Sequence, residues 1–141
     1  MNLYAESSAV LAWLLGEAAG QDIRVLLGEA DTVVATDLPL VECDRTVCRM
    51  SALGIIDEQA TADCRRQFTA EIAHWTILPF APQIIARARQ PFPNEPIRAF
   101  DALHVASALH AQTAFPDLAM LSLDERVRRV ARSLGLPLLP S

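Results

Sequence analysis

The feature that most limits the possible folds is an alternation of short apolar runs with longer segments of helical period. Within each run nearly every residue is apolar, which is typical of strands covered on both faces rather than on one. A parallel sheet wrapped by helices satisfies this pattern. The sequence therefore predicts an α/β fold, a three-layer α/β/α sandwich with a mostly parallel sheet of about five strands. The strands are expected at residues 2–5, 32–36, 75–80, 119–123 and 137–139.

Helical segments are predicted between these strands. Asp37 and Asp124 stand where they can cap the helices that follow them, and Asp37 is assigned to capping alone. A proline-rich stretch at residues 91–96 suits neither a helix nor a strand and is predicted to be a rigid loop. The helices are expected at residues 8–15, 21–29, 38–53, 58–73, 82–89, 97–112 and 125–134.

The length of the chain fits one domain, spanning residues 1–141, with a core that needs no disulfide or structural metal. The three cysteines lack the close spacing of a zinc site and are expected to be small core residues in a reducing environment. The sequence has neither a secretory signal nor an apolar run of about eighteen residues. A cytoplasmic protein that does not span a membrane is therefore expected.

The charged residues exclude several functions. The net charge is −5, with 17 acidic residues against 12 basic ones, so the chain as a whole does not attract nucleic acid nonspecifically. All twelve basic residues are arginine, which excludes Schiff-base lysine chemistry and a P-loop. It also argues against a phosphate-accepting receiver domain, which needs a lysine near its fifth strand. Four arginines, at positions 126, 128, 129 and 132, are expected to form the solvated face of the last helix.

Acidic residues stand where the predicted strands end. Glu6 follows the first strand and Asp124 the fourth, while Glu42 and Asp101 lie near the starts of two helices that enter from the same edge. In open α/β sheets the functional crevice lies beyond the carboxyl ends of the strands. Carboxylates gathered there repel one another unless a cation neutralises them. An all-oxygen set suits Mg²⁺ or Mn²⁺, and such an ion can promote phosphodiester cleavage.

Each of these acids also has a structural alternative. Glu6 and Asp124 each precede a helix, where an acid interacts favourably with the helix dipole, and Asp124 can cap the last helix instead of acting in catalysis. Glu42 can form an ion pair with Arg45 at i+3, and Asp101 can pair with Arg98 at i−3. The residues alone leave both readings open.

Four segments in chain order resemble the signature blocks of PIN-domain nucleases, and in particular the VapC-type toxins of bacterial toxin–antitoxin pairs. They are LYAESSA at 3–9, LVE at 40–42, RAFDALHVA at 98–106 and LSLDER at 121–126. The resemblance covers almost the whole chain, and DALHVA is its most specific part. It implies a PIN-like fold and a Mg²⁺- or Mn²⁺-dependent endoribonuclease, a hydrolase that is usually a homodimer bound by a small antitoxin.

The resemblance also implies roles for individual residues. The catalytic and metal-binding pocket would consist of Glu6, Glu42, Asp101 and Asp124. Ser7 and Ser122 match positions where small hydroxyl residues support a ligating carboxylate or a water, with helix capping as the alternative for serines 7 and 8. Independently of the resemblance, the helical offset of Arg98 places it beside Asp101, where it can orient that carboxylate or contact a phosphate. His104 matches a position that serves the structure.

One position departs from the family pattern. The first acid of the family is nearly always Asp, and here it is Glu6, whose side chain reaches about 1.5 Å further. Mg²⁺ demands a narrow range of ligand positions. Either the pocket has adjusted so that Glu6 still ligates, or the chain is a PIN fold that has lost catalysis and acts as a binding module. The presence of the other three acids favours the first outcome.

Overall fold

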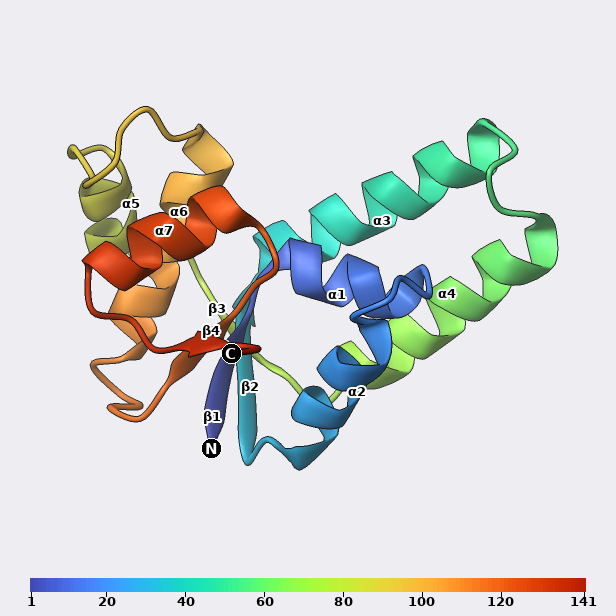
Figure 1. Ribbon diagram of the computed structural model, residues 1–141, viewed down its shortest axis with the longest axis horizontal. Coiled ribbons are helices and arrows are strands. Elements are labelled where there is room, and N and C mark those ends of the chain that lie inside the picture. Colours follow the sequence, from blue (N-terminus) through green and yellow to red (C-terminus); the bar gives the residue numbers. More distant parts are fainter.

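Five parallel strands form the central layer of the computed structural model, which describes residues 1–141 (Figure 1). The strands are β1 (Asn2–Ala5), β2 (Thr32–Thr36), β3 (Thr76–Leu78), β4 (Ala119–Leu121) and β5 (Leu138–Leu139). Their spatial order is β3-β2-β1-β4-β5, so the chain starts in the middle of the sheet and adds strands on both sides. Leu3 of β1 pairs with Val33 of β2 and with Ala119 of β4. The carboxyl ends of all strands therefore meet at one edge.

Seven helices connect and cover the strands, each within two residues of its predicted bounds. They are α1 (Ser7–Leu14), α2 (Gly20–Glu29), α3 (Asp37–Ala52), α4 (Glu58–Ile72), α5 (Pro82–Ala88), α6 (Ala99–Ala111) and α7 (Glu125–Ser133). Figure 1 shows α3 and α4 side by side as a hairpin that extends well beyond the sheet.

The sheet separates two hydrophobic cores, and successive side chains along a strand point alternately into one core and the other. Leu3 and Ala5 of β1 face the core made with α1, α2, α3 and α4, whereas Tyr4 faces the core made with α5, α6 and α7. The sheet lies between these two groups of helices (Figure 1). The predicted three-layer α/β/α sandwich with a parallel sheet is confirmed.

The expectation that every strand is buried on both faces is wrong for the two edge strands, since both residues of β5 are only half-buried and β3 is more exposed still. Thr76 is exposed and its two strand neighbours are only half-buried, because β3 lies at the edge of the sheet. β3 also ends at Leu78, two residues earlier than predicted, since Pro79 has no amide hydrogen to donate to a ladder. β4 likewise ends early, at Leu121, and the chain then turns toward α7.

Four helix starts differ from the prediction: α1, α2 and α3 each begin one residue earlier and α6 begins two residues later. Thr36 caps α3, since its hydroxyl accepts a hydrogen bond from the amide of Leu38 at 3.2 Å, and Asp37 is the first helical residue rather than the cap. α6 begins at Ala99, two residues later than predicted, because Arg98 has an extended backbone with ψ 159°. The rigid loop therefore continues up to the first turn of α6.

The cysteines follow the prediction in part. All three are free thiols, and Cys43 and Cys64 are buried core residues. Cys48 is only half-buried, and its sulfur accepts a hydrogen bond from Arg65 at 3.1 Å, because it lies on the outward part of the α3–α4 hairpin. A membrane span would need a longer apolar helix than any this fold contains.

Candidate active site

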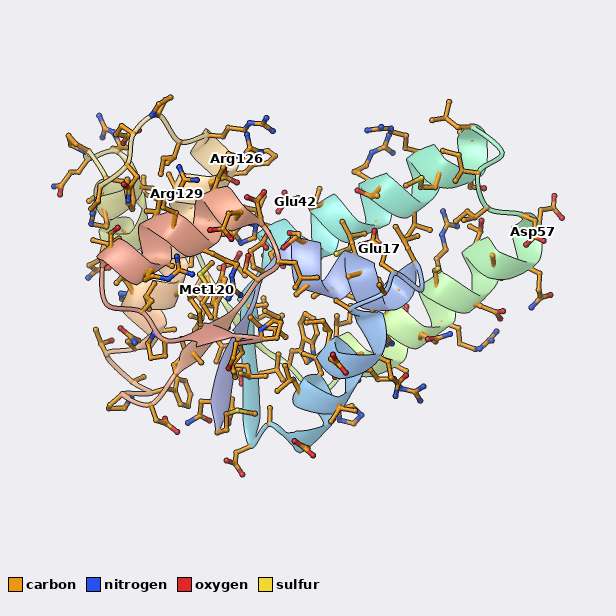
Figure 2. The ribbon with its side chains drawn as sticks, viewed as in Figure 1. Glu17, Glu42, Asp57, Met120, Arg126 and Arg129 are labelled. Atoms are coloured by element: carbon orange, nitrogen blue, oxygen red, sulfur yellow. The ribbon has the colours of Figure 1, made fainter.

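The sheet order places the predicted acidic residues at one end of the molecule. Glu6 directly follows β1, and Asp124 follows β4, the strand beside it. Glu42 lies on α3, which follows β2, the other neighbour of β1, and Asp101 lies in the first turn of α6. Figure 2 shows Glu42 at this end of the strands, near the start of α3. These distant segments meet because β1 lies in the middle of the sheet, with β2 on one side of it and β4 on the other.

Glu6 is almost fully buried and ties the end of β1 to the end of β4. Its Oε2 accepts hydrogen bonds from the amide of Ser8 at 3.2 Å, from the Ser8 hydroxyl and from the Ser122 hydroxyl at 2.8 Å. The first of these bonds caps α1. Its other oxygen, Oε1, lies 3.9 Å from Nε2 of His104. The longer side chain of Glu therefore serves as a helix cap while one carboxylate oxygen stays free of hydrogen bonds.

Ser8 joins the two loops at this edge. Its hydroxyl donates to Glu6 and its oxygen accepts from the amides of Leu123 at 2.9 Å and Asp124 at 3.0 Å. The sequence suggested only helix capping for this serine, and its role as a link was missed. The only sequence signal for a role of Ser8 at the acidic site was its position directly after Glu6 and Ser7.

Glu42 is held by two donors. The Ser7 hydroxyl donates to Oε1 of Glu42 at 2.6 Å, and Nε2 of His104 lies 2.6 Å from the same oxygen. Burial pushes the pKa of Glu42 upward, but the hydrogen bonds from His104 and Ser7 outweigh burial and hold the pKa below its ordinary value. The alternative ion pair of Glu42 with Arg45 is not formed. The Glu42 carboxylate instead contacts His104.

His104 is buried and bonded at both ring nitrogens. The hydroxyl of Tyr4 lies 3.2 Å from Nδ1, and burial raises the pKa of Tyr4 well above its ordinary value, so this phenol keeps its proton. Because the ionised carboxylate of Glu42 can only accept, Nε2 carries a proton and donates it to Oε1 of Glu42. His104 is thus a satisfied buried histidine, as expected, and it also fixes the position of a candidate ligand. His104 follows Asp101 by one helical turn, so the sequence already indicated that its side chain lies on the face of α6 that carries the site.

Asp124 has the capping role that the sequence left open. Its Oδ1 accepts from the amides of Arg126 at 2.8 Å and Val127 at 3.3 Å, so Asp124 caps α7. Its Oδ2 makes no hydrogen bond and lies 3.7 Å from the guanidinium of Arg126. Figure 2 shows Arg126 on the same side of the molecule as Glu42. Capping and a contact with a ligand can therefore use different oxygens of one carboxylate.

Asp101 carries a buried oxygen without a partner. Its Oδ2 is inaccessible to solvent and has no hydrogen bond. Burial and then the charge of Asp124 raise the pKa of Asp101, with Arg126 acting against them. The alternative ion pair with Arg98 is not formed, and Arg98 is exposed at the start of α6. An orphaned carboxylate oxygen beside a second carboxylate is an arrangement that a cation would relieve.

Each of the four acids has at least one oxygen free of hydrogen bonds, including Oε1 of Glu6, Oε2 of Glu42, Oδ2 of Asp101 and Oδ2 of Asp124. By donor chemistry this set fits Mg²⁺ or Mn²⁺, and the orphaned oxygen of Asp101 is the observation that favours a ligand. As the side chains are placed, no three His, Cys, Asp or Glu residues are grouped closely enough to hold an ion together.

The arginines of α7 do not all have the solvated role expected of them. Arg126, Arg129 and Arg132 are exposed, but Arg128 is half-buried. Its guanidinium donates to the carbonyl oxygens of Ser122 at 2.7 Å, Leu139 at 3.3 Å and Pro140 at 2.8 Å. Arg128 therefore binds the loop after β4 to the last residues of the chain.

Comparison with known proteins identifies the family and the fold. The PIN domain family model matches residues 3–133, a range that contains all four acids. The fold is similar to the crystal structure of VapBC2 from Rickettsia felis bound to a DNA fragment from its promoter, with a TM-score of 0.63 and 11% sequence identity. That match covers 98% of this chain and 97% of the other. No curated protein sequence gives a significant match. The chain belongs to the PIN domain family.

Proposed function

We propose that this protein is a Mg²⁺- or Mn²⁺-dependent endoribonuclease and the toxin of a toxin–antitoxin pair. The observation that carries the nuclease proposal is the orphaned oxygen of Asp101, buried beside the charge of Asp124 at the carboxyl edge of a PIN-family sheet. The toxin assignment is supported by the resemblance of the signature segments to VapC-type toxins and by the VapBC2 structure among the similar folds.

The residues that would hold the cation are Glu6, Glu42, Asp101 and Asp124, each through its free oxygen. Bound there, the ion would activate a water and stabilise negative charge on an RNA phosphate. Ser7 and His104 keep the carboxylate of Glu42 turned into the site. Ser122 does the same for Glu6 through Oε2. No side chain needs to form a covalent bond with the substrate.

The nuclease proposal is tested with purified protein and a labelled RNA that contains single-stranded loops. We expect cleavage with Mn²⁺ or Mg²⁺ and none with EDTA. Asp101→Asn should lower the rate at least about 100-fold, since even residues that only support a ligand commonly change activity by 10–100-fold. Asp44→Asn is the matched control, because Asp44 is an exposed acid two residues beyond Glu42 and so on another face of α3. An unchanged rate for Asp101→Asn would remove Asp101 from the mechanism.

Glu6 needs a test of its own, because it already caps α1. Glu6→Gln keeps a carbonyl oxygen that can accept from Ser8 and Ser122, so the fold should be retained. If Glu6 is a ligand, calorimetry should show weaker Mn²⁺ binding by Glu6→Gln than by the parent protein. Equal affinity, together with RNA binding but no cleavage by the parent protein, would favour a non-catalytic binding module.

The proposed partners are a small antitoxin and a second copy of this chain. Apolar side chains stand exposed on the helices, among them Val41 at 57% and Phe100 at 55%, and such surface is available for association. Light scattering should give about twice the 15.4 kDa of one chain, and a clean monomer at high concentration would contradict the homodimer.

A short protein encoded by the adjoining reading frame should bind this chain and suppress RNA cleavage, and undiminished cleavage in that complex would contradict the toxin assignment.

A further inference from the structure

A pocket of about 390 Å³ opens beside the first turn of α6. It is lined by the end of α5, by the loop that follows it and by the first turn of α6, including Ala99 and Ala102. Asp101 stands between these two residues in the sequence, so the pocket adjoins the helical turn that carries the orphaned carboxylate. None of the residues that line this pocket belongs to the proposed cation site, although the sequence suggested that Arg98 orients Asp101 or contacts a phosphate.

The loop that forms one wall of the pocket is held in place. The guanidinium of Arg87 lies over the ring of Phe92, 4.0 Å from its centroid, and donates to the carbonyl oxygen of Pro91 at 3.3 Å. Asn94, at φ 62°, donates to the hydroxyl of Ser133 on α7 at 2.7 Å. Phe92 itself is 5% exposed. The wall is therefore anchored on both α5 and α7.

Two arginines and one acid line the pocket, and neither arginine is paired with an acid. Arg89 and Arg98 both line it, both are exposed, and neither forms an ion pair or a side-chain hydrogen bond. Glu95 is the acid among the lining residues, but its two oxygens accept from the backbone amides of Phe92 and Ile97, each at 2.9 Å. Two guanidinium groups are left to face an anion that enters the pocket.

We propose that this pocket binds a backbone phosphate of the RNA substrate next to the phosphate that is cleaved, with Arg89 and Arg98 as its contacts. Guanidinium groups recognise phosphate oxygens through paired donors, and such contacts set the position of a nucleic acid without reading its sequence. Phe100, 55% exposed between Ala99 and Asp101, offers a face on which the adjoining base stacks. This inference rests on the proposed nuclease function and names the substrate subsite of that function.

The salt dependence of RNA binding tests the phosphate contacts directly. A short fluorescein-labelled polyuridine is titrated with protein in EDTA, and the binding constant is measured by anisotropy at several salt concentrations. Each single-strand phosphate contact contributes about 0.7 to the slope of log K against log salt. Arg89→Ala and Arg98→Ala should each reduce the slope by about that amount. Arg89→Lys and Arg98→Lys keep the charge and should keep the slope.

Two further variants complete the design. Arg24→Ala is the matched control, because Arg24 is an exposed arginine on α2, and α2 lies across the sheet from α5 and α6 (Figure 1). Its slope should equal that of the parent protein. Phe100→Ala should weaken binding about fivefold or more without changing the slope, since stacking involves no counterions. Circular dichroism confirms that each variant is folded.

The outcomes separate this inference from the function on which it rests. Reduced slopes for the two alanine variants, with no cleavage by the parent protein in Mn²⁺, support the pocket and contradict the nuclease. Cleavage by the parent protein with unchanged slopes supports the nuclease and overturns the pocket. Absence of polyuridine binding overturns it as well. Binding of a polyglutamate peptide in place of RNA would show that the two arginines serve a protein partner and would also overturn it.

Discussion

Nε2 of His104 lies 2.6 Å from Oε1 of Glu42, which joins α6 to α3 through a partly buried hydrogen bond at the carboxyl edge of the sheet. Tyr4 of β1 completes the chain at Nδ1 of the same ring. Two helices and the central strand are therefore fixed to each other by polar groups. Because the interior dielectric is low, each of these bonds depends on the presence of its neighbours.

The hydrogen bond between Tyr4 and His104 should be measurable as a coupling energy. Tyr4→Phe leaves Nδ1 buried without its partner, and we expect a loss of about 1–3 kcal/mol in the free energy of unfolding. His104→Gln removes the other partner. In urea unfolding, the double variant should lose less than the sum of the single losses, by about 0.5–3 kcal/mol. Strictly additive losses would show that the two groups do not interact.

The raised pKa of Asp101 gives a pH-dependent effect on stability in the absence of divalent cations. The folded protein binds this proton more tightly than the unfolded chain does, so ionised Asp101 lowers stability. The penalty begins as pH rises above the ordinary pKa of 3.8 and is complete above the folded-state pKa. At neutral pH, Asp101→Asn should therefore be more stable than the parent protein by less than about 1 kcal/mol, because solvent screens this half-exposed group.

Urea unfolding across a pH series checks this sign. The difference between Asp101→Asn and the parent protein should vanish below pH 3.8, where both side chains are neutral in either state. Added Mn²⁺ should stabilise the parent protein and leave Asp101→Asn nearly unchanged. Asp44→Asn, at an exposed position on α3, serves as the control. A variant less stable than the parent protein at neutral pH would contradict the unfavourable burial of Asp101.

Arg128 should anchor the end of the chain. Arg128→Ala removes the donor to three carbonyl oxygens, and we expect a loss of about 1.5–3 kcal/mol, as for hydrogen bonds made by charged groups. The amide of Ser122 bonds to the carbonyl of Leu139 across β4 and β5, so its hydrogen exchange should accelerate. Arg129→Ala, one position further along α7 and exposed, should change stability by less than about 0.5 kcal/mol. Equal effects of the two substitutions would show that the three contacts contribute nothing.

Two glycines of α2 should respond to alanine in opposite ways. A Cβ at Gly20 would collide with the carbonyl oxygen of Ala12 where α2 crosses α1, so Gly20→Ala should destabilise by about 1–3 kcal/mol. A Cβ at Gly28 would meet no atom within 4 Å, and Gly28→Ala should stabilise the helix by about 0.5–1 kcal/mol. Thermal unfolding of the two variants measures both effects. A tolerated Gly20→Ala would mean that α1 and α2 move apart freely.

Much of the fold could be predicted because its signals are local. The apolar run Thr32–Thr36 is as long as the strand it forms, and prolines and glycines stand near the ends of the helices. The difference at Thr36 and Asp37 arose from two adjacent residues that can both cap a helix, and the backbone of Thr36 decided between them. The shortened β3 arose from its place at the edge, which the strand's own residues do not specify.

The sequence by itself determined which segments become strands and helices, and it located acidic residues at the ends of the strands, because periodicity and capping act over a few neighbouring residues. The tertiary structure alone decided which polar groups meet. Ser8 bonds to Leu123, His104 to Glu42 and Arg128 to Pro140, since parallel pairing of β1 with β2 and β4 brings together segments that are far apart along the chain. Such contacts follow from the order of the strands, which no local pattern encodes.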